Sequence, residues 1–139
     1  MNPKSIDWGL LFLRLGLGVV FLAHGSQKLF SFGLAGVSGF LSSQGYPLAS
    51  LFAAILILTE FGGGILVLLG LLTRLATFLI MLVMAVAIFT VHLSHGFFLP
   101  QGMEQAFALF FMALALVLCG GGRFSLDTMF LGKKQSTTT

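Results

Sequence analysis

The chain has 139 residues, of which 58% are hydrophobic and 8% are charged, and its mean hydropathy is +1.08. Soluble domains contain about 25% charged residues, so this composition excludes an ordinary soluble domain and indicates a protein of the lipid bilayer. Seven basic and four acidic residues give a formal net charge of +3, which we attribute to anchoring at cytoplasmic lipid headgroups and not to nucleic-acid binding. The single cysteine excludes an internal disulfide.

Four apolar runs follow one another along the chain, at residues 8–29, 48–71, 75–93 and 103–119. Each can form a helix that crosses a hydrocarbon core about 30 Å thick, which takes roughly 20 residues, and the last run is the shortest. A β-barrel would need alternating polarity, whereas residues 80–89 are apolar on every face. The sequence therefore predicts an all-α membrane protein, built as a bundle of four transmembrane helices.

The connection between the first two runs is uncharged and contains a short pattern of apolar and small residues at 37–41. This pattern predicts a short helix that lies at the membrane interface and is ended by Gly45 and Pro47. At the other end of the chain the last residues are mostly polar. We therefore expect one four-helix transmembrane domain over residues 1–130 and a polar cytoplasmic tail over residues 131–139.

The basic residues of the predicted loops and ends fall on one side of the membrane if both termini are cytoplasmic: Lys4, Arg74, Arg123, Lys133 and Lys134. Because basic residues in short loops stay cytoplasmic, we predict a multi-pass membrane protein with cytoplasmic N- and C-termini. The first and third connections between the runs then lie on the opposite side.

Four charged residues lie within or at the ends of the apolar runs: Arg14, Lys28, Glu60 and Glu104. A charge in hydrocarbon is costly and usually has a partner and a function, so these residues are the first candidates for a site. Helical spacing places Arg14 on a glycine-containing face of the first helix, and we expect it to pair with Glu60 inside the bundle. Such a pair is either purely structural or a group that handles protons or orients a ligand.

A second group of polar residues is expected at the non-cytoplasmic end of the bundle: His24, Lys28, His92, His95 and Glu104. Three interpretations are open for it, namely a metal site, a polar pocket for an organic headgroup, and simple hydration at the interface. A bis-histidine haem would need two facing imidazoles across the bundle. We assign no metal ligand and predict two roles, which are catalysis by Glu60 and Glu104 and ligand binding by Arg14, His24, Lys28, His92 and His95.

The polar residues stand in a fixed order among glycines: Arg14, Gly18, His24, Gly25, Lys28, Glu60, the segment 70–74 (Gly-Leu-Leu-Thr-Arg), His92, Glu104 and the segment 120–127 (Gly-Gly-Gly-Arg-Phe-Ser-Leu-Asp). This order resembles the DoxX family of small bacterial inner-membrane proteins, from about residue 11 to residue 127. The resemblance implies a four-helix bundle in the bacterial inner membrane. It also implies that four polar positions are shared with the family, which are Arg14, Lys28, Glu60 and Glu104.

The resemblance further implies redox chemistry. Some members of the family are associated with the small subunit of a thiosulfate:quinone oxidoreductase, and others with membrane complexes that respond to oxidative or thiol stress. This chain has no flavin motif and no pair of cysteines of its own. A redox role would therefore require a partner redox subunit, a homo-oligomer or a bound cofactor. The identity of the cofactor is unknown, and a quinone is the candidate.

We therefore predict a membrane redox subunit or accessory protein, in which a quinone or a similar apolar ligand binds in a polar-lined cleft between helices. It would be a subunit of a quinone-linked oxidoreductase if it takes part in catalysis. Two alternatives belong to other classes of function. One is a proton-coupled transporter or exporter of small molecules with Arg14 and Glu60 as its gate, and the other is a non-catalytic membrane scaffold for a soluble redox enzyme.

Overall fold

The computed structural model describes residues 2–134, and within this range the chain is helical and contains no strand. Three helical spans are long and apolar enough to cross a membrane: Pro3–Ser43, Ala49–Leu69 and Thr73–His95. The fourth predicted span is the 16-residue helix α6 (Glu104–Cys119), which is apolar but shorter than the roughly 20 residues of a full crossing. The predicted helical membrane bundle is confirmed.

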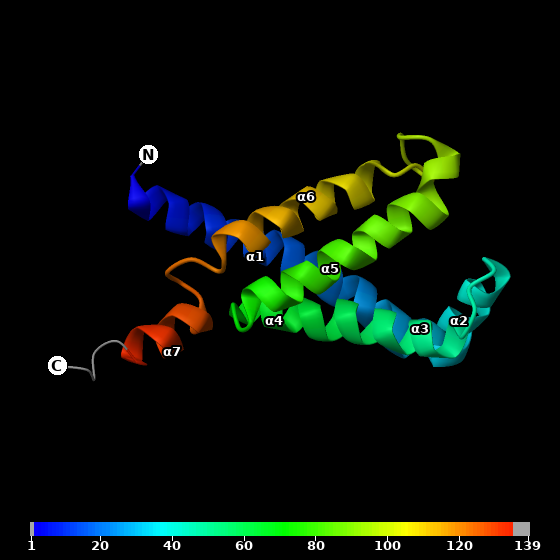
Figure 1. Ribbon diagram of the computed structural model, residues 1–139, viewed down its shortest axis with the longest axis horizontal. Coiled ribbons are helices and arrows are strands. Elements are labelled where there is room, and N and C mark those ends of the chain that lie inside the picture. Colours follow the sequence, from blue (N-terminus) through cyan, green and yellow to red (C-terminus); the bar gives the residue numbers. More distant parts are fainter. Residues whose placement is uncertain (1, 135–139) are drawn as a thin grey trace.

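The first span is not one uniform helix. It consists of α1 (Pro3–Ser26), a π-helical segment η1 (Gln27–Phe32) and α2 (Gly33–Ser43), which contains the residues where the sequence predicts a short helix. The chain changes direction between η1 and α2 because Gly33 has a φ of 68°, a conformation that favours glycine. The result is that α2 turns away from the axis of α1 at the end of the bundle (Figure 1).

The second and third spans are interrupted in the same manner. The second consists of α3 (Ala49–Ile57), a π-helical segment η2 (Leu58–Gly62) and α4 (Gly63–Leu69). The third consists of α5 (Thr73–Ala87), a π-helical segment η3 (Ile88–His92) and the 3₁₀ turn η4 (Leu93–His95). Each of the three long spans therefore contains one π-helical segment.

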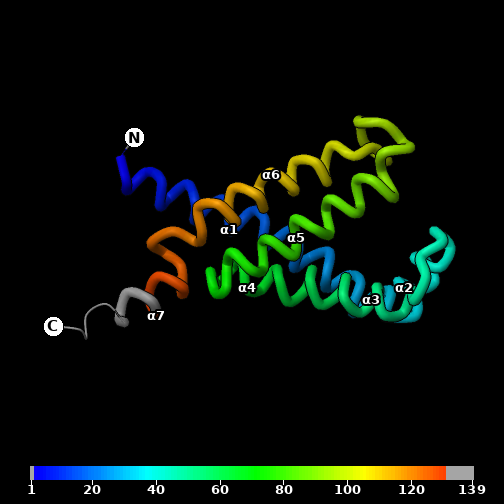
Figure 2. Tube along the Cα trace, viewed as in Figure 1, coloured from blue at the N-terminus to red at the C-terminus, as the bar shows by residue number. Residues whose placement is uncertain are grey.

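The helices are arranged as two packed pairs. Helix α1 packs along η2 and α4, and α5 packs along α6. The start of α1, the segment after α6 and the turn between α4 and α5 lie at one end of the molecule, whereas α2 and the connection between η4 and α6 lie at the other (Figure 1). Figure 2 shows that the pair formed by α5 and α6 diverges from α3 toward this second end.

Glycines determine how closely α1 approaches the second span. A Cβ atom built on Gly25 would lie 2.3 Å from the backbone nitrogen of Phe61, and one built on Gly64 would lie 2.5 Å from the backbone nitrogen of Leu22. Neither contact is sterically possible, so these positions admit only glycine at this helix separation. Buried side chains fill the rest of the contact between the pairs, among them Leu17, Phe21, Val67, Ile80 and Leu116.

A short helix that the sequence analysis does not anticipate follows α6. Helix α7 (Leu126–Lys134) contains Asp127, whose carboxylate oxygens accept hydrogen bonds from the backbone N–H groups of Leu72 and Thr73 at 2.7 and 2.8 Å. These N–H groups stand at the start of α5, so Asp127 caps that helix from a distance in the sequence. Of the predicted tail, residues 135–139 lie outside the described residues.

Candidate ligand-binding site

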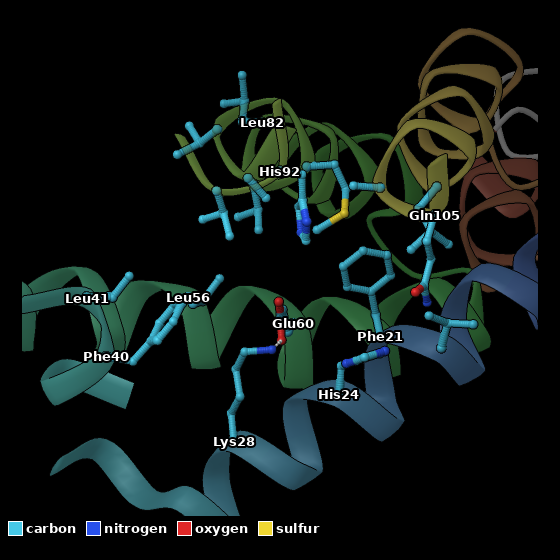
Figure 3. Close-up of a pocket in the computed structure, with 18 of the residues that line it drawn as sticks. Phe21, His24, Lys28, Phe40, Leu41, Leu56, Glu60, Leu82, His92 and Gln105 are labelled. Carbon is cyan, nitrogen blue, oxygen red and sulfur yellow. Dashed lines mark hydrogen bonds and ion pairs between the residues drawn. The ribbon is translucent and has the colours of Figure 1, made fainter. Parts of the chain in front are cut away.

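A cavity of about 560 Å³ lies where the two helix pairs diverge. Its volume is within the range of small-molecule sites. The walls are mainly apolar side chains from α1, α2, α3, α5 and α6, including Phe21, Phe40, Phe52, Leu82 and Leu109. Figure 3 shows that the labelled polar residues Lys28, Glu60 and His92 come from three different helices and lie around the same space.

The strongest polar contact in this cavity joins η1 to η2. The ammonium nitrogen Nζ of Lys28 donates to Oε2 of Glu60 at 2.6 Å. The Lys28 side chain is 22% exposed and that of Glu60 is 6% exposed, so the carboxylate is nearly enclosed and the ammonium opens toward the cavity. An ion pair removed from water persists only when both charges are compensated, and here each charge compensates the other.

The expected pair of Arg14 with Glu60 is wrong. Arg14 is 2% exposed, and its guanidinium donates to four backbone carbonyl oxygens at 2.8–3.1 Å, those of Val67, Leu68, Gly121 and Phe124. Two of these carbonyls belong to the C-terminal end of α4, where the helix dipole favours a cation. Arg14 therefore ties α1 to the end of α4 and to the connection after α6, and it does not line the cavity. This geometry therefore contradicts the transporter gate that was predicted from a pair of Arg14 and Glu60.

His92 enters the cavity from η3. Its ring nitrogen Nδ1 lies 3.0 Å from the backbone carbonyl oxygen of Gln101, in the connection that leads to α6. In Figure 3 the imidazole points from η3 into the cavity, toward the level of Glu60 and Phe21. His24 also lines the cavity, but it lies at the exposed edge of α1, one turn before Lys28.

Two predicted residues lie elsewhere. His95 is exposed, and its Nδ1 is 2.9 Å from the carbonyl oxygen of Val91 in its own helix. Glu104 begins α6 and, like His95, is not among the residues that line the cavity. In the part of the chain that the structure describes, no group of three or more His, Cys, Asp or Glu side chains is arranged to hold a metal ion. A metal site of His24, His92, His95 and Glu104, one of the interpretations left open by the sequence, is therefore not formed by these residues.

The π-helical segments coincide with the polar positions of the cavity. Lys28 lies in η1, Glu60 in η2 and His92 in η3. A π turn holds one residue more than an α turn, so it rotates the side chains that follow it around the helix axis, and such turns are frequent at functional sites. No feature of the sequence analysis predicts these segments. The three consecutive glycines at 62–64 next to η2 are the nearest signal, because they loosen a helix.

Two further residues that line the cavity were not predicted from the sequence. Tyr46, in the connection after α2, forms a hydrogen bond through its hydroxyl group to the hydroxyl group of Thr90 in η3. Gln105 reaches the cavity from the first turn of α6. Both come from segments adjoining a predicted helix end, so their positions depend on how the helix pairs diverge.

Comparisons with known proteins agree with the architecture. The family described as DoxX matches residues 9–93. A protein of Bacillus subtilis (strain 168), named "Putative oxidoreductase CatD", is 34% identical over 137 residues, which are 98% of this chain and 98% of that protein. A protein of Escherichia coli (strain K12), named "Inner membrane protein YqjF", is 30% identical over 139 residues, covering 94% of this chain and 98% of its own. No solved structure matches the chain.

Proposed function

Because the chain belongs to the DoxX family of membrane proteins, we propose that it is a membrane redox subunit or accessory protein that binds a quinone or a similar apolar ring in the cavity between its helix pairs. A redox-related role is supported by the family and by the name of the Bacillus subtilis relative. The ligand is our proposal, and it rests on the chemistry of the cavity walls.

The observation that carries the proposal is the ion pair of Lys28 and Glu60 in a cavity with apolar walls. Flat rings bind in apolar clefts that supply a few placed polar groups. The ammonium of Lys28 has two N–H groups beyond the one that it donates to Glu60, so it can also donate to a carbonyl oxygen of the ring. In this proposal Glu60 takes up or releases a proton when the ring changes its redox state.

Electrons must come from elsewhere. Reduction of a quinone to a quinol takes two electrons and two protons, and the sequence has no flavin motif and a single cysteine. We therefore propose that a partner redox subunit, or a cofactor held with a second copy of the chain, delivers or receives the electrons. In this proposal the termini and Arg74 are cytoplasmic, so the cavity lies in the opposite half of the membrane.

Binding of a short-chain quinone to the purified protein in lipid nanodiscs tests the proposal, with empty nanodiscs as the blank. We expect saturable binding, weakened about tenfold or more by Glu60→Gln and by Lys28→Met, because each change leaves a charge without its partner. Lys4→Met removes a lysine at the other end of the molecule and should bind as the wild type does. Absence of saturable binding, both in the isolated protein and in complexes extracted from membranes, would overturn the proposal.

A further inference from the structure

The hydrogen bond at Nδ1 of His92 determines what the other nitrogen of this ring offers to a ligand. The partner is the backbone carbonyl oxygen of Gln101, at 3.0 Å, and a carbonyl oxygen can only accept. Nδ1 must therefore carry the hydrogen. A neutral imidazole has one N–H group, so Nε2 keeps its lone pair and is a hydrogen-bond acceptor.

Nε2 is free to meet a ligand. It has no hydrogen-bond partner within residues 2–134, and the ring points into the cavity from η3 (Figure 3). The carbonyl that orients the ring is held by the connection before α6, in which Gly96 and Phe97 accept backbone hydrogen bonds from Met103 and Glu104 at 3.0 and 2.9 Å. The connection therefore keeps the acceptor of His92 directed at the cavity.

From this geometry we infer that the cavity binds the hydroxyl-bearing, reduced form of its ring ligand in preference to the oxidised form, with His92 as the residue that makes the distinction. The inference rests on the proposed function, since it specifies the redox state of the ligand of the same cavity. An oxidised quinone presents only acceptors, and an acceptor placed against Nε2 makes no hydrogen bond. A hydroxyl group on the ring donates to Nε2 and still accepts from Lys28.

The charges of the cavity agree with a hydroxyl-bearing ligand. Glu60 is a second acceptor, and its one negative charge is already matched by Lys28. An anionic headgroup would meet two acceptors and would add a second negative charge beside a pair that is already neutral, which is costly away from water. An uncharged hydroxyl group satisfies an acceptor without changing the charge balance. Sites that hydrogen-bond a hydroxyl group discriminate strongly against analogues without it, because a buried polar group is then left unpaired.

Nuclear magnetic resonance of protein labelled with ¹⁵N in its histidines tests the acceptor directly and needs no ligand. In a variant with His24→Gln and His95→Gln, the remaining histidine signals belong to His92 alone. We expect the neutral form with hydrogen on Nδ1 and an unprotonated Nε2. A hydrogen on Nε2 with Nδ1 unprotonated would overturn the inference and would leave the proposed function standing.

The preference for a hydroxyl group is tested with a para-alkylphenol and its methyl ether of equal chain length, which do not interconvert. In nanodiscs we expect the phenol to bind about threefold to tenfold more tightly than the ether, the effect of one hydrogen bond. His92→Phe keeps a ring but removes the acceptor, so it should abolish this preference, whereas His95→Phe, outside the cavity, should retain it. Equal binding of both probes by the wild type overturns the inference alone. Absence of saturable binding by both probes, while a short-chain quinone still binds, also overturns the inference alone, whereas absence of binding by all three compounds overturns the proposed function as well.

Discussion

Lys28 and Glu60 meet across two π-helical segments, with Nζ 2.6 Å from Oε2, although the residues are 32 positions apart in the sequence. The contact joins η1 to the middle of the second span, and both residues line the cavity. Glu60 is almost enclosed, so the pair links the two spans inside the protein. It is the only salt bridge found in residues 2–134. Its contribution to stability can be separated from its proposed role in ligand binding by measurements on the protein without ligand.

Removing one partner of this pair should destabilise the protein more than removing both. We expect Lys28→Met to lower the free energy of unfolding by about 3 kcal/mol, because Glu60 is left as an uncompensated buried charge. The double change of Lys28→Met and Glu60→Met should recover a large part of this loss. Thermal unfolding in one detergent measures all variants, and additive losses in the double variant would contradict the coupling of the two residues.

The approach of α1 to η2 depends on Gly25. In Gly25→Ala the new Cβ would overlap the backbone of Phe61, so α1 and η2 must separate, and we expect a destabilisation of about 1–3 kcal/mol. The same separation should weaken the contact of Lys28 with Glu60. Gly62→Ala is the matched control, since a Cβ there meets nothing within 4 Å and the residue lies in η2, the segment that Gly25 approaches. Equal melting temperatures for the two variants would contradict the close packing of Gly25 against the backbone of Phe61.

Arg14 should be irreplaceable by lysine. The guanidinium uses four hydrogen bonds in a fixed planar arrangement, whereas an ammonium has three donors and a single centre. In Arg14→Lys at least one buried carbonyl loses its partner, at a cost of about 1–3 kcal/mol. Arg74→Lys changes an arginine that makes one hydrogen bond, at 3.2 Å to the carbonyl of Leu118, and should have little effect on melting temperature. An Arg14→Lys variant with the melting temperature of the wild type would contradict the inference that the hydrogen bonds of Arg14 hold α1 to the end of α4.

The hydrogen bond between Tyr46 and Thr90 should hold the segment after α2 against η3. Tyr46→Phe removes only the hydroxyl group, and we expect amide hydrogen exchange in residues 41–48 to accelerate about twofold to tenfold. Exchange in α1 should stay unchanged, because that helix is held by other contacts. Unaltered exchange in the 41–48 segment would show that this hydrogen bond does not hold the segment after α2 against η3.

The choice of ionic partner shows why the site was harder to predict than the fold. Arg14 and Lys28 are 14 positions apart on one apolar helix, and either side chain is long enough to reach a carboxylate on a neighbour. Which of them meets Glu60 depends on how far α1 slides and rotates against the second span. That register is set by Gly25 and Gly64, which pack directly against backbone atoms of the facing helix. No single stretch of sequence contains this information.

Hydropathy alone determined that this chain forms apolar membrane helices, because the cost of placing polar backbone or charge in hydrocarbon acts on each segment by itself. The same cost identified Arg14, Lys28 and Glu60 as residues that need partners. Only the tertiary structure decided that backbone carbonyls satisfy Arg14, that Lys28 pairs with Glu60, and that His92 lies in the cavity while His95 does not. These outcomes depend on π-helical turns and on close contacts between helices, which arise only when segments distant in the sequence pack together.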